Sequence, residues 1–345
     1  MADNVDGGPY VPPKVQGGAD AFIAAGAPTG DGKLKIFGGP YQPPNGARAM
    51  AAAHYGGAGV GLFLRAASPS TGRLLPRGRD RTQVDGEISR WATDIARMER
   101  VTAGQRLMFA TQEFVHGLVI NCGAPSNTAA GTFSVTMHST LIDEHRTPEE
   151  ARDRRAEVAA LPARKAPSSA KLRLLQTACE GENPVWRFVL PLDLLPDESA
   201  LTGELLDVVN DVVSAVVYPI KSWLNVDRPS VIDTAVVPML PVPPHSSFPS
   251  GHATAAHALA VVIAALTGTA YAPLETLAHS IAEGRELVGL HTPTDSLSGA
   301  QLGKSIGTYM VNMAFGNDAR YSSWRALFVK ASDRWAPASA AGNAA

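Results

Sequence analysis

The chain has 345 residues, of which 45% are hydrophobic and 18% charged, a composition typical of globular rather than disordered proteins. Its 30 basic and 32 acidic residues give a net charge of −2, so there is no basic excess to bind nucleic acid. The two cysteines have neither a paired nor a metal-binding spacing, which excludes a disulfide framework.

No targeting segment is visible in the sequence. The N-terminus lacks the cationic and apolar stretches of a secretory signal. The longest apolar stretch, residues 253–266, is too short to span a bilayer and predicts a buried helix. We therefore expect a cytoplasmic protein without a membrane span.

The first half of the chain is predicted to have two parts. Residues 1–84 are expected to form an irregular arm, because residues 1–50 are rich in glycine and proline and a basic loop follows at 73–81. Residues 85–200 are expected to be a helical region of unknown role. Helical patterns there cover 88–98, 107–119 and 149–161, and a linker follows at 162–169.

The second half has the stronger helical pattern. Residues 201–318 are predicted to be the core. A long helix there carries the apolar stripe Leu205, Val209, Val212, Val213, Val216 and Ile220. Three more helices are expected near 250–266, 273–290 and 292–315, and residues 319–345 are expected to be a tail. No pair of long alternating strands is evident, and aromatic residues are few, so the predicted fold is an all-α helical bundle.

Two cations precede a proline in the stretch from Lys221 to Pro229. Lys221 and Arg228 are seven residues apart, so on one helix they would share a face, and Pro229 would end that helix. Two cations on one face indicate an anion or acidic groups between them, although solvated surface cations are the simpler alternative.

The sequence Pro249-Ser-Gly-His252 stands directly before an apolar helical stretch. Ser250 is a typical helix N-cap, and the free N–H groups of a helix N-terminus bind anions. Gly251 would let an oxyanion approach the backbone, and His252 would lie beside it to give or take a proton. Ordinary capping with a surface histidine is the alternative.

A charged residue continues the apolar face of the third helix. Arg285 lies four residues after Ile281 on the buried stripe, and a buried charge implies a partner. His291 follows at the expected helix end, and Asp295 is within reach to accept its ring N–H. That bond would fix the tautomer and leave the other ring nitrogen as a nucleophile or a ligand.

Together these residues suit a tetrahedral or trigonal oxyanion. They make a poor divalent-metal site, because the cations would repel the metal and only one carboxylate is nearby.

The ordered motifs K-x6-R-P, P-S-G-H and R-x5-H-x3-D resemble the signature of one enzyme superfamily. It joins the type-2 phosphatidic-acid phosphatases with the vanadium-dependent haloperoxidases. Every defining position is present, and the resemblance covers about residues 200–315.

The resemblance implies a role for each motif residue. Those that would hold the phosphate or vanadate oxygens are Lys221, Arg228, Ser250, Gly251 and Arg285. His291 would attack phosphorus in a phosphatase or bind vanadium in a haloperoxidase. His252 would be the acid–base, and Asp295 would orient His291. Both enzymes stabilise a trigonal-bipyramidal centre by fixed positive charge.

The shared motifs leave two reactions open. His245 lies five residues before Ser250, and bromoperoxidases are similar in carrying a histidine there. This feature, with no membrane helix and no signal, favours a haloperoxidase that uses vanadate, hydrogen peroxide and halide, bromide more than other halides. The compact spacing between Pro229 and Pro249 favours instead a phosphatase that takes a phosphoester and needs no cofactor. A non-catalytic anion-binding protein is the third hypothesis, and a homo-oligomer is left open.

Several remaining residues are expected to be structural. His116, His257 and His279 are predicted to have packing or surface roles. Glycines at 299, 303 and 307 recur every fourth residue, which predicts a close crossing of two helices.

Overall fold

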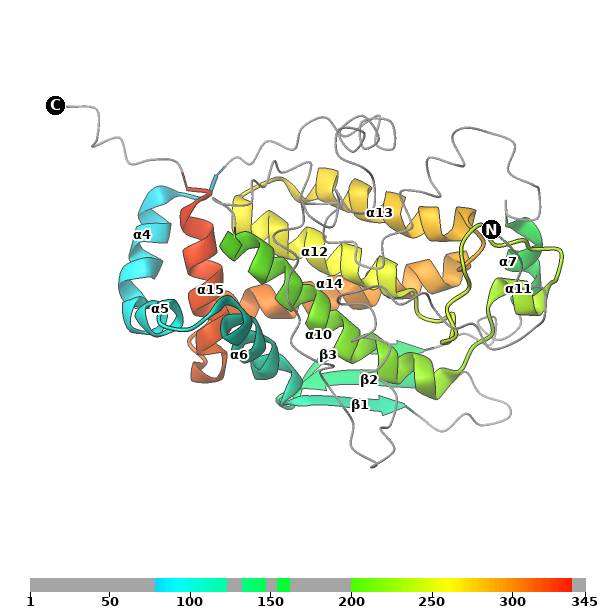
Figure 1. Cartoon of the computed structure of the whole chain (residues 1–345), viewed down its shortest axis with the longest axis horizontal. Helices are drawn as coiled ribbons and strands as arrows, with labels where there is room; N and C mark the ends of the chain where they lie inside the picture. Colours follow the sequence, from blue (N-terminus) through cyan, green and yellow to red (C-terminus); the bar gives the residue numbers. More distant parts are fainter. Residues whose placement is uncertain (1–77, 123–131, 147–153, 162–199, 337–345) are drawn as a thin grey trace.

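The computed structural model describes residues 78–122, 132–146, 154–161 and 200–336, and within them the protein is a helical bundle with one small sheet (Figure 1). The helices are α4 (Arg81–Arg90), α5 (Ala92–Glu99), α6 (Ala103–Val115), α7 (Arg155–Ala160), α10 (Ala200–Leu224), α11 (Pro229–Ile232), α12 (Gly251–Thr267), α13 (Tyr271–Leu287), α14 (Pro293–Phe315) and α15 (Ser322–Asp333). A 3-10 turn, η3 (Ala319–Tyr321), precedes α15. The predicted all-α bundle is confirmed.

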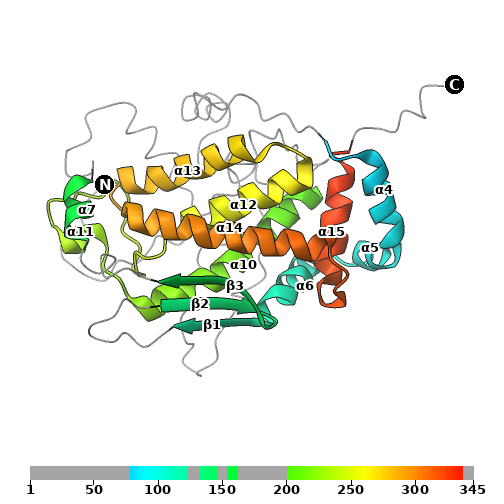
Figure 2. The same ribbon diagram turned by 180° about the vertical axis from the view of Figure 1, so that it is seen from behind.

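Helix α12 is the central element of the bundle. It lies among α10, α13 and α14, which run along the long axis of the molecule in both views (Figures 1 and 2). Its residues are mostly alanine, valine and leucine, most of them are buried and none is exposed, as expected for a helix that is apolar all round. Helices α4, α5 and α15 lie at one end of this bundle, and α7 and α11 lie at the other.

Glycines of α14 bring its backbone against α12. A Cβ on Gly303 would lie 2.2 Å from the carbonyl oxygen of Thr254, and one on Gly307 would lie 2.8 Å from that of Ala258. Contacts this short leave no room for any side chain at these positions. The predicted close crossing of two helices is confirmed.

The long helix predicted from residue 201 is α10. The six residues of its stripe are all at most 2% exposed: Leu205, Val209, Val212, Val213, Val216 and Ile220. Helices α12, α13 and α14 also lie where their patterns predict, within a few residues at each end.

A three-stranded antiparallel sheet replaces part of the expected helical region. Its strands are β1 (Leu118–Cys122), β2 (Thr132–Met137) and β3 (Thr140–Arg146), in the order β1-β2-β3. Phe133, Val135 and Met137 alternate toward the core and are at most 1% exposed. The hairpin between β2 and β3 turns through His138 and Ser139 with positive φ angles of 47° and 70°. Neither residue is a usual choice for such a turn, so the sequence carried no clear hairpin signal.

The tail expected over 319–345 is wrong for residues 319–336, and residues 337–345 lie outside the described part of the chain. Helix α15 packs against α4, α5, α6, α10 and α14, and its Trp324 and Phe328 are fully buried. The carboxylate of Glu113 on α6 accepts the N–H groups of Ser323 and Trp324 at 2.7 and 2.8 Å. A side chain 210 residues earlier therefore caps the start of α15, so the helix lacks a local start signal.

Other expectations fall partly outside the described residues. Of the arm expected over 1–84, residues 1–77 lie outside them, and α4 already begins at Arg81. The linker expected at 162–169 also lies outside. Of the helix expected over 149–161, the structure describes 154–161, where α7 is a short helix.

Candidate active site

The N-terminus of α12 forms one side of the candidate site. Ser250 is the N-cap residue, and its own N–H donates to the carbonyl oxygen of Asp295 at 3.0 Å. A Cβ on Gly251 would lie 4.0 Å from Cε of Lys221, so the lysine runs alongside this turn. His252 is half-buried in the same turn. The N–H groups and the positive dipole end of this turn favour an anion here.

Lys221 is buried rather than solvated. It is 1% exposed, and its Nζ donates to the carbonyl oxygens of Ser246 and Ser247 at 2.8 and 2.9 Å. Burial, followed by the positive charge of Arg228, lowers the pKa of Lys221 well below its ordinary value. The surface-cation alternative is wrong for this residue.

Arg228 does not share a helix with Lys221 as expected. Helix α10 ends at Leu224, and Asn225 has a positive φ of 46° that turns the chain. Arg228 is the N-cap of α11, and Pro229 is the first residue of that helix rather than the end of α10. The two cations therefore reach one site from a helix and from a loop.

Hydrogen bonds fix the guanidinium of Arg228 on several sides. Its Nη1 donates to the carbonyl oxygen of Leu290 at 2.8 Å, and its Nε donates to that of His245 at 3.1 Å. Nη1 also lies 3.2 Å from Nε2 of His291. Burial lowers the pKa of Arg228 to about 10, so the group is charged at neutral pH.

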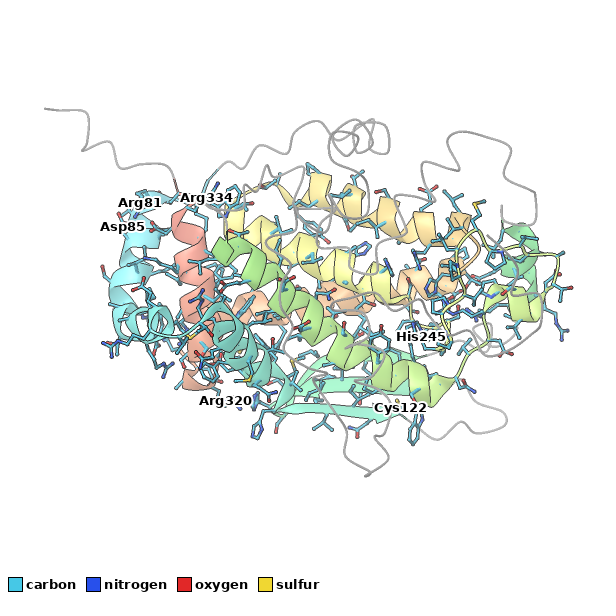
Figure 3. All side chains as sticks on the ribbon, viewed as in Figure 1. Arg81, Asp85, Cys122, His245, Arg320 and Arg334 are labelled. Carbon is cyan, nitrogen blue, oxygen red and sulfur yellow. The ribbon has the colours of Figure 1, made fainter. Side chains whose placement is uncertain are left out.

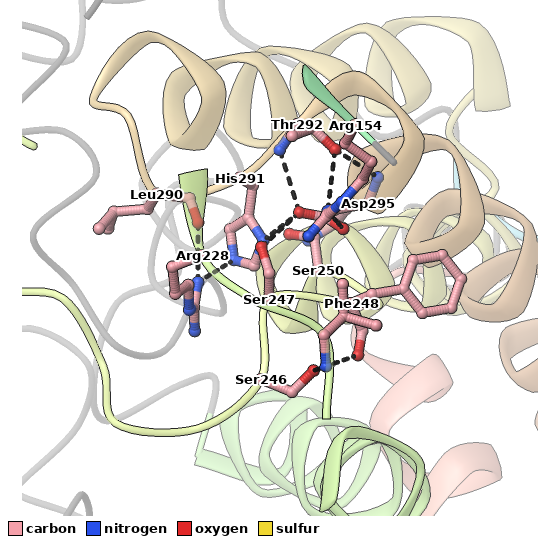
Figure 4. Close-up of polar contacts among 12 residues, drawn as sticks. Arg154, Arg228, Ser246, Ser247, Phe248, Ser250, Leu290, His291, Thr292 and Asp295 are labelled. Carbon is pink, nitrogen blue, oxygen red and sulfur yellow. Dashed lines mark hydrogen bonds and ion pairs between the residues drawn. The ribbon is translucent and has the colours of Figure 1, made fainter. Parts of the chain in front are cut away.

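The imidazole of His291 lies between an arginine and a carboxylate (Figure 4). Because the guanidinium of Arg228 can only donate, Nε2 of His291 is the acceptor and carries no proton. Nδ1 then donates to Oδ2 of Asp295 at 3.3 Å. Burial, followed by the charge of Arg228, lowers the pKa of His291 well below its ordinary value, which agrees with a neutral ring. The expected tautomer is the one that these contacts require.

Asp295 is fully buried and anchored at the start of α14. The side chain of Thr292 and that of Asp295 form a capping box, and the backbone N–H of Thr292 donates to Oδ2 at 3.0 Å. Burial alone would raise the pKa of Asp295. The hydrogen bond from His291 and the positive charge of Arg154 instead hold that pKa well below its ordinary value.

Arg285 reaches the same region from the last turn of α13. It is 6% exposed, as its place on the apolar stripe predicts. Its positive charge contributes to the lowered pKa values of Lys221 and Arg228, so the three cations lie close enough to interact.

The comparison with known protein families decides the family of this part of the chain. The model of the PAP2 superfamily matches residues 208–319. These residues belong to the PAP2 superfamily. No curated protein matches the chain. PAP2 proteins are generally phosphatases or haloperoxidases, so the match supports an enzyme in general and leaves the type of reaction open.

The PAP2 segment contains every residue singled out from the motifs. The structure places them at the end of the bundle near α7 and α11, on α10, α12, α13, α14 and the connecting loops. His245 lies toward this end, far from the Arg81–Asp85 ion pair at the other (Figure 3).

His245 lies beside the PAP2 site, on the loop that leads to Ser250. Its Nδ1 accepts from Nη2 of Arg228 at 3.0 Å, and its ring packs edge-on against Tyr218 with centroids 5.3 Å apart. Burial, followed by the charges of Lys221 and Arg228, lowers the pKa of His245 to about 3. Arg228 therefore contacts two neutral histidines, His291 and His245.

Two residues at the PAP2 site were not expected from the sequence. The hydroxyl of Ser247 donates to Oδ2 of Asp295 at 2.5 Å. Arg154 forms a buried ion pair with Oδ1 of the same carboxylate, from outside the matched segment. Arg154 lies in a run of charged residues, which is typical of a solvated helix face. No local signal therefore distinguishes it from the other charged residues around it in the sequence.

Two further findings concern the part of the chain that the structure describes. None of its helices is long and apolar enough to cross a membrane. No group of three or more histidine, cysteine, aspartate or glutamate residues is arranged there to hold a metal ion.

Proposed function

We propose that the chain is a vanadate-dependent haloperoxidase, which uses hydrogen peroxide to oxidise halide, bromide more readily than chloride. The observation that carries this choice is His245. It is a second neutral histidine hydrogen-bonded to the arginine that contacts His291. Phosphoester hydrolysis needs a nucleophile and one acid–base, and His291 and His252 would already supply both, so His245 has no role in that reaction.

The donor set fits vanadate, which is a tetrahedral oxyanion of the size of phosphate. Lys221, Arg228 and Arg285 supply positive charge, and Ser250 and the first turn of α12 supply further donors. Nε2 of His291 carries no proton and would be the protein atom bound to vanadium. When bound, vanadate acts as a Lewis acid that activates hydrogen peroxide toward attack by the halide.

The protein residues would then have separate tasks. Arg228 now donates to Nε2 of His291, and this Nη1 donor would turn to an oxyanion oxygen and so free the ring nitrogen. Asp295 would keep the proton on Nδ1. His252 would move a proton to or from the oxygen atoms of the oxyanion that binds at the start of α12.

His245 would act through its other ring nitrogen. Nδ1 lies 3.0 Å from Nη2 of Arg228, which can only donate, and 3.2 Å from the carbonyl oxygen of Ser246, which can only accept. With the shorter contact made, Nδ1 is the acceptor and Nε2 would carry the proton of the neutral ring. That N–H is a donor beside the oxyanion-binding cations, and it would hydrogen-bond the peroxide or the incoming halide. The overall reaction converts halide, hydrogen peroxide and one proton to hypohalous acid and water.

A phosphatase is the second candidate, and the compact spacing between Pro229 and Pro249 favours it. In that reaction His252, in the first turn of α12, would protonate a leaving alcohol. Nε2 of His291 would attack phosphorus, the ester oxygen would leave with a proton from His252, and water would then hydrolyse the phosphohistidine.

Vanadate separates the two reactions because it acts oppositely in them. The purified apo-protein is assayed with and without orthovanadate, for bromination of monochlorodimedone with peroxide and bromide and for hydrolysis of para-nitrophenyl phosphate. We expect vanadate to switch on bromination, phosphate to compete with it, and both His291→Ala and His245→Ala to weaken it. His279→Ala, at an exposed histidine, is the control. A hydrolase that vanadate inhibits as a transition-state analogue, with no brominated product, would establish the phosphatase instead.

A further inference from the structure

Arg154 is a buried charge at the site that comes from outside the PAP2 segment. Its side chain is 0% exposed, as is that of Asp295, with which it forms an ion pair through Nη1 and Oδ1 (Figure 4). The same Nη1 donates to Oγ1 of Thr292 at 3.1 Å, and Nη2 donates to the carbonyl oxygen of Asp227. One guanidinium thus joins the start of α14 to the loop that carries Arg228.

Independent contacts hold the backbone of Arg154 in place. It is the N-cap of α7, which packs against α11. Val158 of α7 is fully buried and forms a small apolar cluster with Ile232 and Val236. Glu157 accepts a hydrogen bond from Oγ1 of Thr294 at 2.5 Å. The arginine therefore enters the site from a docked element and not from a free chain.

The two oxygens of Asp295 have different partners. Oδ2 accepts from His291, from Ser247 and from the backbone N–H of Thr292. Oδ1 accepts from Arg154. Leaving a buried carboxylate oxygen without its charged partner costs free energy. Without Arg154 the carboxylate would therefore rotate until another group donates to Oδ1. That rotation would take Oδ2 away from Nδ1 of His291.

We propose that Arg154 is a positioning residue of the His291 site, which orients the carboxylate of Asp295 and, through the Asp227 carbonyl, the loop of Arg228. The proposal rests on the proposed function in one respect, which is that His291 is the residue that binds the oxyanion. Outer contacts of this kind typically change affinity or activity by about 10–100-fold when removed. The element that contains α7 would thus complete a site that the matched segment alone leaves unsupported.

The test uses the full chain with Arg154→Met and Arg154→Lys and two readouts. The first is the ¹⁵N NMR signature of the His291 tautomer in histidine-labelled protein, and the second is the Kd for orthovanadate by calorimetry. For Arg154→Met we expect loss of the pure Nδ1–H tautomer and a Kd weakened roughly 10–100-fold. Arg154→Lys, which keeps a donor and a charge, should recover part of both.

Two control variants separate positioning from a general loss of stability. Glu157→Ala removes one contact of α7, that with Thr294, but leaves both the Asp295 ion pair and the Val158 cluster that also holds α7. Arg325→Met removes another arginine that is 1% exposed, stacked on Trp91 away from the site. Both should keep the wild-type tautomer and Kd, whatever their melting temperatures.

Three outcomes would overturn the proposal. In the first, Arg154→Met keeps the wild-type tautomer and Kd. In the second, the Arg325→Met control changes both readouts as much as Arg154→Met does. In the third, Arg154→Met fails to fold and Arg154→Lys is indistinguishable from the wild type in both readouts. Failure of the proposed function gives a different result, because the wild-type protein would then show no vanadate-dependent bromination. The effect of the Arg154 variants on the His291 tautomer could still be measured in that case.

Discussion

At the scale of single residues, the site is a balance of buried charges. Arg228 and Arg285 are cations with little exposure, Asp295 is a fully buried anion, and Arg154 pairs with it directly. The excess of positive charge leaves the site ready for an oxyanion, whereas His291 remains neutral between Arg228 and Asp295. Arg154 and Asp295 compensate each other's charge in the interior, so the excess comes from the remaining cations.

Asp295→Asn is expected to destabilise the protein strongly. It keeps the size of the side chain but removes the negative charge, which leaves Arg154 buried without its counter-ion. Breaking a buried pair in this way costs about 3–5 kcal/mol in the free energy of unfolding, to be measured by urea denaturation. The control is Asp85→Asn in the exposed pair with Arg81, which should change stability little. Equal effects of the two variants would contradict the assignment of a buried ion pair.

At the scale of elements, the crossing of α12 and α14 holds the two halves of the site together. Ser250 precedes α12 and His291 precedes α14, so the distance between these helices sets the distance between the residues. The glycines of α14 let the backbones meet without intervening side chains. Close packing of the helices is thus a condition for the geometry of the site.

Gly303→Ala is expected to separate the two helices. Its Cβ would lie 2.2 Å from the backbone oxygen of Thr254, which cannot move without its helix, and such overpacking costs about 1–3 kcal/mol. Gly203→Ala on α10 is the matched control. Nothing lies within 4 Å of a Cβ there, so it should stabilise the helix by about 0.5–1 kcal/mol. Thermal unfolding should show opposite signs for the two changes, and the same sign would refute this account of the crossing.

At the scale of the whole molecule, buried neutral histidines couple stability to pH. Burial, and then nearby positive groups, lower the pKa of His245 to about 3. Burial is also the main cause that lowers the pKa of His257, to about 4. In the unfolded chain both would have pKa values near 6.5. Below that pH the unfolded state binds protons that the folded state does not, so these groups make stability fall as the pH falls.

Replacing His257 should therefore reduce the loss of stability in mild acid. Its contribution is fully present above pH 6.5 and is lost as the pH falls toward 4, at about 1.4 kcal/mol per pH unit. Partly buried carboxyls whose pKa is raised by burial, such as Glu113, act in the opposite direction, so the measurement compares variants at each pH. His257→Gln should flatten the curve of unfolding free energy between pH 6.5 and 4.5. The exposed His116→Gln should not, and parallel curves for all three proteins would show that His257 is not held neutral.

The sequence by itself determined the bundle helices α10, α12, α13 and α14 and the motif residues that they present. Their signals are local, because an apolar residue every three or four positions, or an N-cap before a helix, lies within a few turns of what it specifies. The buried Arg285 and the contact of His291 with Asp295 followed from the same spacing. In each case the residues concerned lie on one helix or at its end, so their spacing in the sequence is enough to place them.

Only the tertiary structure decided which distant segments support that site. Arg154 meets Asp295 across 141 residues, and Glu113 caps α15 across 210, and no short-range pattern encodes either contact. The turn at Asn225, which separates Lys221 from Arg228, likewise became evident only in the folded chain. Such partners are chosen by burial: a charge or a free N–H group in the interior must be satisfied by whatever side chain the packing brings there, wherever that residue lies in the sequence.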